Sequence, residues 1–226
     1  MQMLPRWLST LLLLLVASPP FAEQNVNPAI NLGYQNPNVT QWSGVFERDG
    51  REIWDRRDDI LANLRLQPGQ RVADIGAGTG FFSVMMARTV GPTGRVYAVD
   101  IAPNFVDATV KRARTQGLGN VIGVVNDARS VQLPPDSIDL AFLSDTYHHF
   151  EYPRSTLRSI HQALAPGGEM VVIDFHRIPG QSHPWVLGHV RAGEQQFRAE
   201  IEEAGFELVE RLDFMRSQYY LRFRKR

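Results

Sequence analysis

The chain has 226 residues, with 24 Lys and Arg balanced by 24 Asp and Glu, six His and no Cys. This length allows one large domain with a substantial core, and a hydrophobic content of 43% is typical of a globular protein rather than a disordered one. The zero net charge argues against a nucleic-acid partner, and the lack of Cys excludes disulfides, thiolate nucleophiles, thiolate-bound metals and iron–sulfur clusters.

Residues 1–22 have the layout of a secretory signal peptide. Arg6 supplies one positive charge, Leu11–Ala17 is a short apolar stretch, and Ser18–Ala22 offers a cleavage site after Ala22. The apolar stretch is about half as long as the roughly 20 residues that span a bilayer, so we predict no stable membrane span. The favoured location is therefore outside the cytoplasm, with the periplasm as the expected compartment. An uncleaved anchor and a misassigned start codon are the alternatives, and the second would leave the protein in the cytoplasm.

Residues 23–50 are rich in Asn, Pro and Gln, a composition typical of turns. We predict an extended lead-in to the domain that contains neither helix nor strand. Three aromatic residues in it, Tyr34, Trp42 and Phe46, would allow this segment to cover a bound ligand as a lid. Ordinary core packing of these three rings is the alternative.

Residues 51–226 alternate between helical and strand patterns and are predicted to form the main domain. In chain order we expect a helix with Ile53, Trp54, Ile60, Leu61 and Leu64 on one face, strand 71–75, helix 81–90, strand 95–100, helix 103–116, strands 121–126 and 138–144, a helix with Leu157, Ile160 and Leu164 inward, strand 170–175, a helix with Phe197, Ile201 and Ala204 inward, and strands 206–213 and 218–223. Strands separated by helices indicate a mostly parallel sheet covered on both faces. The last two strands are joined by a short turn and must be antiparallel. We therefore predict an α/β fold with a doubly wound, Rossmann-like sheet of seven strands, mostly parallel with an antiparallel C-terminal pair.

A glycine-rich turn follows the first predicted strand, at the edge where open α/β sheets bind ligands. The segment Asp74-Ile-Gly76-Ala-Gly78-Thr-Gly80 lets the backbone approach a ligand and opens a helix N-terminus. Asp100 ends the second strand, where a carboxylate can accept both hydroxyls of a ribose. Together these features indicate a cofactor that contains adenosine. Dinucleotide sites favour a third glycine where this chain has Phe81, which argues against NAD.

With its further motifs, this region resembles the class I S-adenosylmethionine-dependent methyltransferases. The resemblance covers about residues 51–224 and includes, besides the glycine turn and Asp100, the segments Asn126–Ala128, Leu133–Asp139, Leu164–Gly168 and Glu203–Phe206. The terminal antiparallel strand pair distinguishes this family from a plain Rossmann fold. The resemblance implies S-adenosylmethionine as cofactor and a small molecule as methyl acceptor.

The resemblance also implies a role for each residue group along the binding edge. The methionine portion would be held by Asp74 and the backbone of Gly76, Gly78 and Gly80, the ribose by Asp100, the adenine by Asp127 and the backbone of Ala128, and the space near the sulfonium would be closed by Ser144 and Asp145. For Asp74 and Asp127, helix capping or a turn is the alternative.

The histidines cluster in the sequence after the fourth and fifth strands. Because a sulfonium methyl is already activated, the enzyme mainly aligns the acceptor, but an acceptor that loses a proton also needs a base near neutral pH. We predict that His148 or His149 is this base or positions the acceptor, next to Asp145. Adjacent side chains point apart, so only one of the two is expected to face the site, with Tyr147 and His176 lining it. Hydrogen bonding within a loop is the alternative for each.

A metal site built from these histidines with Asp145 or Asp174 is chemically conceivable. The sequence shows no tight ligand spacing, however, and we predict no metal. The connection 178–191 is the longest in the domain, and its Trp185 is a candidate to stack on a planar acceptor.

Two other functions compete with methyl transfer. The first is an exported binding module that keeps the fold and a ligand pocket without catalysis, which would explain export away from the cytosolic cofactor. The second is a nucleotide-dependent oxidoreductase, disfavoured by Phe81 and the terminal strand pair. The sequence carries no oligomerisation signal and does not name the acceptor.

Overall fold

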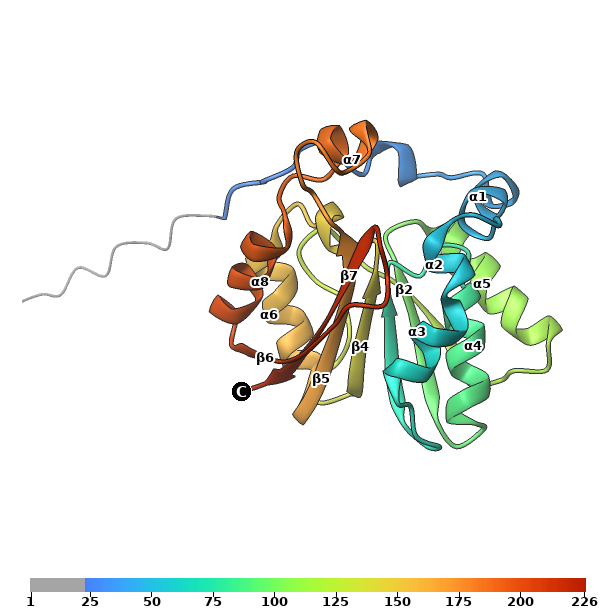
Figure 1. The fold of residues 1–226 in the computed structure, drawn as a ribbon. Coiled ribbons are helices and arrows are strands. Elements are labelled where there is room, and N and C mark those ends of the chain that lie inside the picture. The colour runs from blue at the N-terminus through green and yellow to red at the C-terminus, as the bar shows by residue number, and fades with distance from the viewer. Residues whose placement is uncertain (1–22) are drawn as a thin grey trace, which may run out of the picture.

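A computed structural model describes residues 23–226, so the predicted signal peptide lies outside the described residues. A twisted sheet of seven strands forms the centre, with helices on both faces (Figure 1). The strands are β1 (Arg71–Ile75), β2 (Arg95–Asp100), β3 (Val121–Val125), β4 (Ile138–Ser144), β5 (Leu164–Phe175), β6 (Phe206–Leu212) and β7 (Gln218–Lys225).

The sheet has the strand order β3-β2-β1-β4-β5-β7-β6. The pairs among β1 to β5 are parallel, whereas β7 runs antiparallel to both β5 and β6, which confirms the predicted fold class. Ile75 at the end of β1 lies beside Val99 of β2 and Leu143 of β4. Consequently the residues that follow these positions, Gly76, Asp100 and Ser144, meet at one edge of the sheet.

Helices cover the sheet in two layers, and each layer has its own apolar core. The helical elements are η1 (Leu32–Tyr34), α1 (Val39–Phe46), α2 (Glu52–Asp55), α3 (Arg57–Leu64), α4 (Phe81–Val90), α5 (Pro103–Thr115), η2 (Tyr147–His149), α6 (Pro153–Ala163), α7 (Pro184–His189) and α8 (Glu194–Glu203). Successive residues of β1 point to opposite faces. Val72 packs in the core with Ile60 of α3, and Ala73 packs in the other core with Leu157 of α6.

Four predicted features differ from the structure, and the first is α7 (Pro184–His189), which forms within the predicted connection 178–191. Segment 23–50 contains η1 and α1, because the Asn38 side chain accepts a hydrogen bond from the Gln41 amide (3.0 Å) and caps α1. The predicted helix after Arg51 is interrupted at Arg56 and forms α2 and α3 instead. Leu164 begins β5 rather than lying on α6. The remaining predicted boundaries agree with the observed ones to within two residues.

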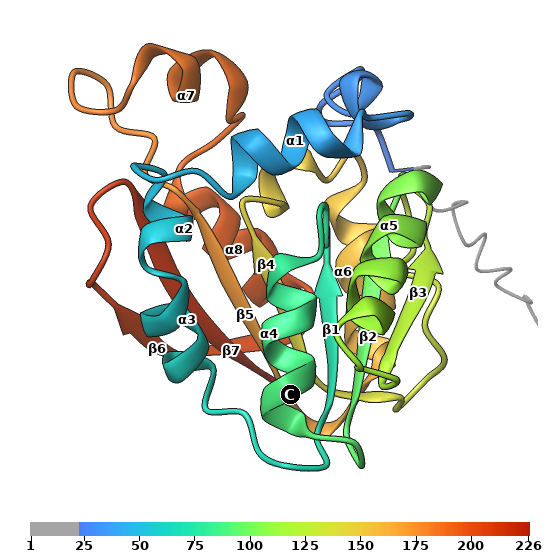
Figure 2. The same ribbon diagram turned by 90° about the vertical axis from the view of Figure 1, so that its right-hand side faces the viewer.

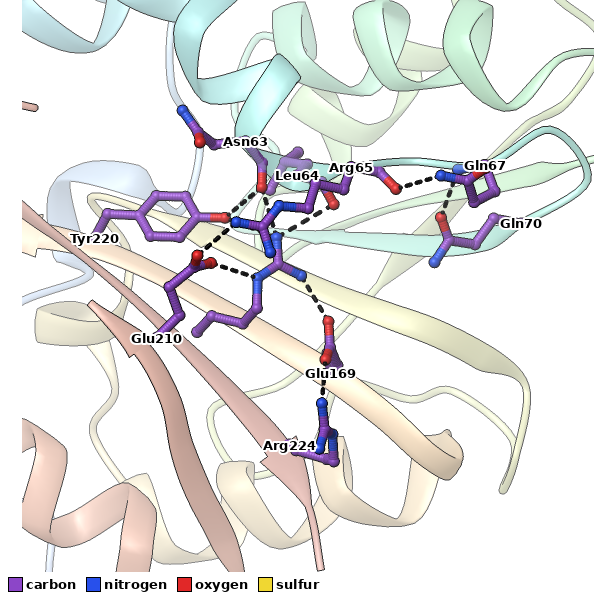
Figure 3. Close-up of polar contacts among 10 residues, drawn as sticks. Asn63, Leu64, Arg65, Gln67, Gln70, Glu169, Glu210, Tyr220 and Arg224 are labelled. Carbon is purple, nitrogen blue, oxygen red and sulfur yellow. Dashed lines mark hydrogen bonds and ion pairs between the residues drawn. The ribbon is translucent and has the colours of Figure 1, made fainter. Parts of the chain in front are cut away.

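The end of α3 is fastened to the C-terminal strands by the buried Arg222. Its guanidinium donates to the carbonyl oxygens of Asn63 (2.6 Å) and Leu64 (3.3 Å) and pairs with Glu169 (2.6 Å). The Tyr220 hydroxyl donates to the same Asn63 carbonyl (2.9 Å), as Figure 3 shows. A cation at a helix C-terminus satisfies the last carbonyl groups and the helix dipole together. This contact therefore fixes α3 against the sheet.

Within residues 23–226, no helix combines the length and the apolar character needed to cross a membrane.

Candidate cofactor and acceptor site

The carboxyl ends of β1, β2 and β4 border a cavity of about 610 Å³. Helices α1 and α7 lie over the same end of the sheet (Figures 1 and 2), and both contribute side chains to the cavity wall. Ten of the eleven predicted site residues line this cavity, namely Asp74, Gly76, Gly78, Asp100, Asp127, Ala128, Ser144, Asp145, His148 and His149. The eleventh, Gly80, is not part of the wall.

Two glycines of the turn after β1 are required by the space around them. Gly76 has a φ of 76°, and a Cβ atom there would lie 2.4 Å from the Thr146 side chain. Gly80 has a φ of 75°, and its Cβ would lie 2.4 Å from the Thr109 side chain on α5. Only glycine adopts such conformations freely. Gly76 thus shapes the cavity wall, whereas Gly80 allows α4 to pack closely on α5.

Asp74 is a buried carboxylate at the end of β1 that faces the cavity. The Ser83 hydroxyl donates to its Oδ2 (2.5 Å), so a neutral group, not a cation, is its hydrogen-bond partner. Burial raises the pKa of Asp74 to about 7; the negative charge of Asp100 adds to this effect and the Ser83 hydrogen bond opposes it. A carboxylate in this state favours a positively charged ligand, because a nearby cation would stabilise its ionised form.

Asp100 is held in place by the backbone on both sides. Its Oδ2 accepts from the Gly78 amide (2.8 Å) and its Oδ1 from the Ala102 amide (2.9 Å). Burial raises the pKa of this carboxyl group, and the backbone donors act in the opposite direction. Each oxygen can accept a second hydrogen bond. The geometry therefore leaves both oxygens able to receive the two hydroxyls of a ribose.

Asp127 lines the cavity but also forms the turn that was the alternative to its binding role. Its Oδ1 accepts from the Arg129 (2.7 Å) and Ser130 (2.9 Å) amides, and its Oδ2 accepts from the Gln132 side chain (2.6 Å). Ala128 lies beside it in the same wall. The contact of these two residues with an adenine stays a prediction.

Ser144 and Asp145 place unsatisfied polar atoms at the end of β4. Within the described part of the chain, Ser144 Oγ and Asp145 Oδ1 are buried and have no hydrogen-bond partner. The other oxygen, Oδ2, pairs with Arg51 (2.8 Å). Burial raises the pKa of Asp145, and the Arg51 charge opposes this. Sequence reasoning missed Arg51, because it lies 94 positions away and carries no local motif.

His148 is fixed by a carboxylate at the end of the neighbouring strand. Its Nδ1 lies 2.8 Å from Asp174 Oδ1, and its backbone amide donates to Asp174 Oδ2 (3.0 Å). Both side chains are almost fully buried. Burial disfavours the protonated ring, but the Asp174 charge outweighs it and raises the pKa of His148.

His149 and His189 complete a cluster with His148 over the cavity. One ring nitrogen from each of the three lies within 4.8 Å of the other two. The prediction that only one of the adjacent pair faces the site is therefore wrong, because the 3-10 turn η2 directs both rings to the same region. Burial, together with the charges on His148 and His189, lowers the pKa of His149 to about 2. His189 ends α7, a helix within the segment 178–191 that the sequence predicts as a connection.

Two other residues expected in the wall lie elsewhere. The buried Tyr147 donates through its hydroxyl to Glu200 (2.9 Å) and packs edge-on against Phe197, so it belongs to the core. His176 packs against Tyr219 and is not part of the cavity wall.

Aromatic side chains from two separate segments line the cavity. Tyr34, Trp42 and Phe46 form a row of tilted rings from η1 to the end of α1, with ring centroids 4.9 and 5.0 Å apart. Phe46 ends this row beside Gly78 of the glycine turn. In α7, Trp185 stacks on His189, with ring centroids 4.5 Å apart. All five rings line the cavity.

The known proteins that this chain resembles include methyltransferases. A family model described as a methyltransferase domain matches residues 66–215. A demethylmenaquinone methyltransferase of Geobacillus kaustophilus is 27% identical over 118 residues, covering 52% of this chain and 50% of that protein. The ubiquinone/menaquinone biosynthesis C-methyltransferase UbiE of Hydrogenovibrio crunogenus is 31% identical over 127 residues, covering 56% and 49%. The aligned region thus spans about half the length of these curated relatives.

Among solved structures, a SAM-dependent methyltransferase from Aquifex aeolicus superposes with a TM-score of 0.73. The superposition covers 84% of this chain and 99% of that one at 21% sequence identity. At this identity the likeness concerns the fold.

Proposed function

The chain belongs to the methyltransferase domain family, and we propose that it transfers a methyl group from S-adenosylmethionine to a small planar acceptor that carries an ionisable hydroxyl group. One observation carries this proposal: a single cavity joins a charged end, with Asp74 and Asp100, to an aromatic end that also holds the histidine cluster. A cofactor and an acceptor can therefore bind next to each other in the same cavity.

The charged end fits S-adenosylmethionine residue by residue. Asp74 would accept from the ammonium of the methionine portion, Gly76 and Gly78 would allow close backbone approach, and Asp100 would accept from the ribose hydroxyls. Ser144 Oγ and Asp145 Oδ1, which are buried and have no partner within residues 23–226, are polar atoms that a ligand would satisfy. When bound, S-adenosylmethionine supplies a methyl group on a positively charged sulfur, which keeps the electron pair of the broken bond as the acceptor attacks.

The aromatic end supports a planar acceptor. Trp42 of α1 and Trp185 of α7 both line the cavity, and flat rings stack well on such side chains. The acceptor would lose its proton on the side of His148 and His149, as the sequence analysis predicts for one of them. The curated relatives are named for demethylmenaquinone and for ubiquinone and menaquinone biosynthesis, so hydroxylated quinols and phenols are the first acceptors to test.

We also propose that the protein acts outside the cytoplasm, on the basis of the signal-peptide layout of residues 1–22. Mass spectrometry of the native N-terminus in fractionated cells tests this proposal. A mature chain that begins at Glu23 in the periplasmic fraction is expected. An intact Met1 in the cytosolic fraction would contradict it.

Methyl transfer is tested by the formation of S-adenosylhomocysteine with a panel of quinols, catechols and simple phenols. We expect turnover with at least one of them, together with micromolar binding of S-adenosylmethionine by calorimetry. Cofactor binding without turnover across a broad metabolite panel would favour the non-catalytic binding module. Binding of NAD in place of S-adenosylmethionine would contradict the proposal as a whole.

A further inference from the structure

Three histidines converge on the acceptor end of the cavity from two elements that are distant in the sequence. His148 and His149 come from η2, after β4, and His189 from the last turn of α7. The ring centroids lie 4.3 Å apart for the adjacent pair, and each of the two lies 5.2 Å from the ring of His189. Neutral imidazole is the commonest protein ligand of divalent transition metals.

The surroundings of His148 leave one ring nitrogen free to bind. Nδ1 faces the Asp174 carboxylate at 2.8 Å, and a carboxylate can only accept, so Nδ1 carries a hydrogen. The other nitrogen, Nε2, is buried and has no partner among the described residues. A carboxylate that holds the far nitrogen of a histidine is the arrangement that orients metal-binding histidines in proteins.

The side-chain amide of Asn31 likewise determines which ring nitrogen of His149 can bind a metal ion. Asn31 Nδ2 donates to the His149 carbonyl (3.1 Å) and to Glu151 Oε1 (2.9 Å), which fixes the orientation of the Asn31 amide. Its Oδ1 therefore faces His149 Nδ1 at 3.1 Å and must accept from it. Nε2 of His149 consequently keeps its lone pair.

His189 supplies the third ring. Its Nε2 is also buried without a partner in residues 23–226, and its ring is held by stacking on Trp185 (4.5 Å, 21° between the planes). Unpartnered buried polar atoms on two of the three rings are costly, and a ligand that accepts their lone pairs would remove this cost.

We propose that His148, His149 and His189 bind one divalent transition-metal ion of the zinc class, with an open coordination position toward the cavity. Because one ring nitrogen of each histidine lies within 4.8 Å of a ring nitrogen of the other two, some point lies about 2.8 Å or less from all three rings, against the 2.0–2.1 Å of zinc–imidazole bonds. Inward movements of less than about 1 Å per ring thus complete the site. Three histidines with one open position is the ligand pattern of catalytic zinc sites.

The role of such an ion rests on the proposed function, whereas its binding does not. A hydroxyl oxygen of the acceptor that binds at the open position would lose its proton to solvent more readily, because the ion stabilises the oxyanion. The oxygen would then hold the electron pair that the methyl group needs. In this arrangement the histidines hold the ion, and none of them needs to be the base. The sequence prediction of no metal relied on spacing along the chain, which cannot reveal His189.

The test measures metal binding directly, on the full protein after removal of any affinity tag and treatment with a chelator. We expect calorimetry and elemental analysis to show one Zn²⁺ bound per chain, with Mg²⁺ not competing, since it prefers oxygen ligands. His149→Gln and His189→Gln should each weaken Zn²⁺ binding at least 100-fold. These two side chains are less buried than His148, so the variants test the site even where a His148 variant fails to fold.

Two further variants separate this site from adventitious binding. His161→Gln removes a histidine of α6 outside the cluster and should leave Zn²⁺ affinity unchanged. Asn31→Ala removes the amide that orients His149 but no metal ligand, and it should weaken Zn²⁺ binding about 10- to 100-fold. Co²⁺, which reports its geometry by its visible absorption, should show a four-coordinate spectrum in the wild type that the His189→Gln variant loses.

The proposal is wrong if the wild type binds no Zn²⁺ at micromolar concentration, or if the two cluster variants bind it as tightly as His161→Gln does. S-adenosylmethionine binding is measured on the same samples. Intact cofactor binding without zinc binding would refute the metal site and leave the methyltransferase proposal standing. Zinc binding without cofactor binding would support the metal site and refute the methyltransferase proposal.

Discussion

Replacing Asp74 by Asn should stabilise the ligand-free protein at alkaline pH while it impairs cofactor binding. Burial raises the pKa of Asp74 from 3.8 to about 7. Because one pKa unit corresponds to 1.36 kcal/mol, ionisation of this group in the folded protein costs on the order of 4 kcal/mol. Asn has nearly the same shape, does not ionise, and can still accept the hydrogen bond from Ser83.

The sign of the pH dependence follows from where the proton is held. Between about pH 4 and pH 7 the folded protein keeps a proton on Asp74 that the unfolded chain has released. The stabilising contribution of this group is therefore complete below its unfolded pKa and is lost as pH rises through about 7. The free energy of unfolding of the wild type should fall relative to Asp74→Asn across this window, by up to roughly 4 kcal/mol.

Urea unfolding at about pH 5 and about pH 8 measures this difference. Asp58→Asn, an exposed change on α3 with the same loss of charge, is the control and should show no such window. If the stability difference between wild type and Asp74→Asn is the same at both pH values, Asp74 does not titrate between them and the reasoning fails.

Cofactor binding provides the second half of the same test. An ammonium group beside Asp74 favours its ionised form, so S-adenosylmethionine should bind more tightly as pH rises through about 7 and should release a proton when it binds below that pH. Calorimetry in buffers of different ionisation enthalpy detects this proton. Asp74→Asn should lose at least 10-fold in affinity and release no proton. Equal affinity in wild type and variant would remove Asp74 from the binding site.

Three other changes have defined outcomes. Arg222→Met should lower the free energy of unfolding by about 3–5 kcal/mol, because it leaves the buried partners of this guanidinium unpaired. The exposed Arg224→Met should cost less than about 1 kcal/mol, and equal costs would contradict the anchoring role of Arg222. Gly80→Ala should cost at least about 2 kcal/mol more than Gly117→Ala, since both glycines have a φ of 75° but only a Cβ at Gly80 meets a neighbouring helix; urea unfolding compares them. Asp100→Ala should abolish S-adenosylmethionine binding in calorimetry, and retained binding would refute the ribose assignment.

The charged end of the cavity was predictable because its geometry is set locally. β1, β2 and β4 are buried apolar runs, and parallel strands bring the residues after them to one edge. Asp74, Gly76 and Asp100 each lie directly at such a strand end, so their positions follow from the strand boundaries. Gly80 follows the same motif yet serves helix packing, since its neighbour Thr109 comes from a helix whose approach no local pattern specifies.

The aromatic end of the cavity depends on contacts between distant segments, which a single sequence does not reveal. Asn31 lies 118 positions from His149, in a segment rich in Asn, Pro and Gln that indicates only turns. Its amide nevertheless determines which nitrogen of the His149 ring is free. His189 reaches the cluster only because α7 folds back over the end of the sheet. If the further inference holds, the N-terminal segment orients a metal ligand as well as covering the cavity. Deleting residues 23–38 should then weaken Zn²⁺ binding in a protein that still folds, and unchanged affinity would show that this segment is a cover alone.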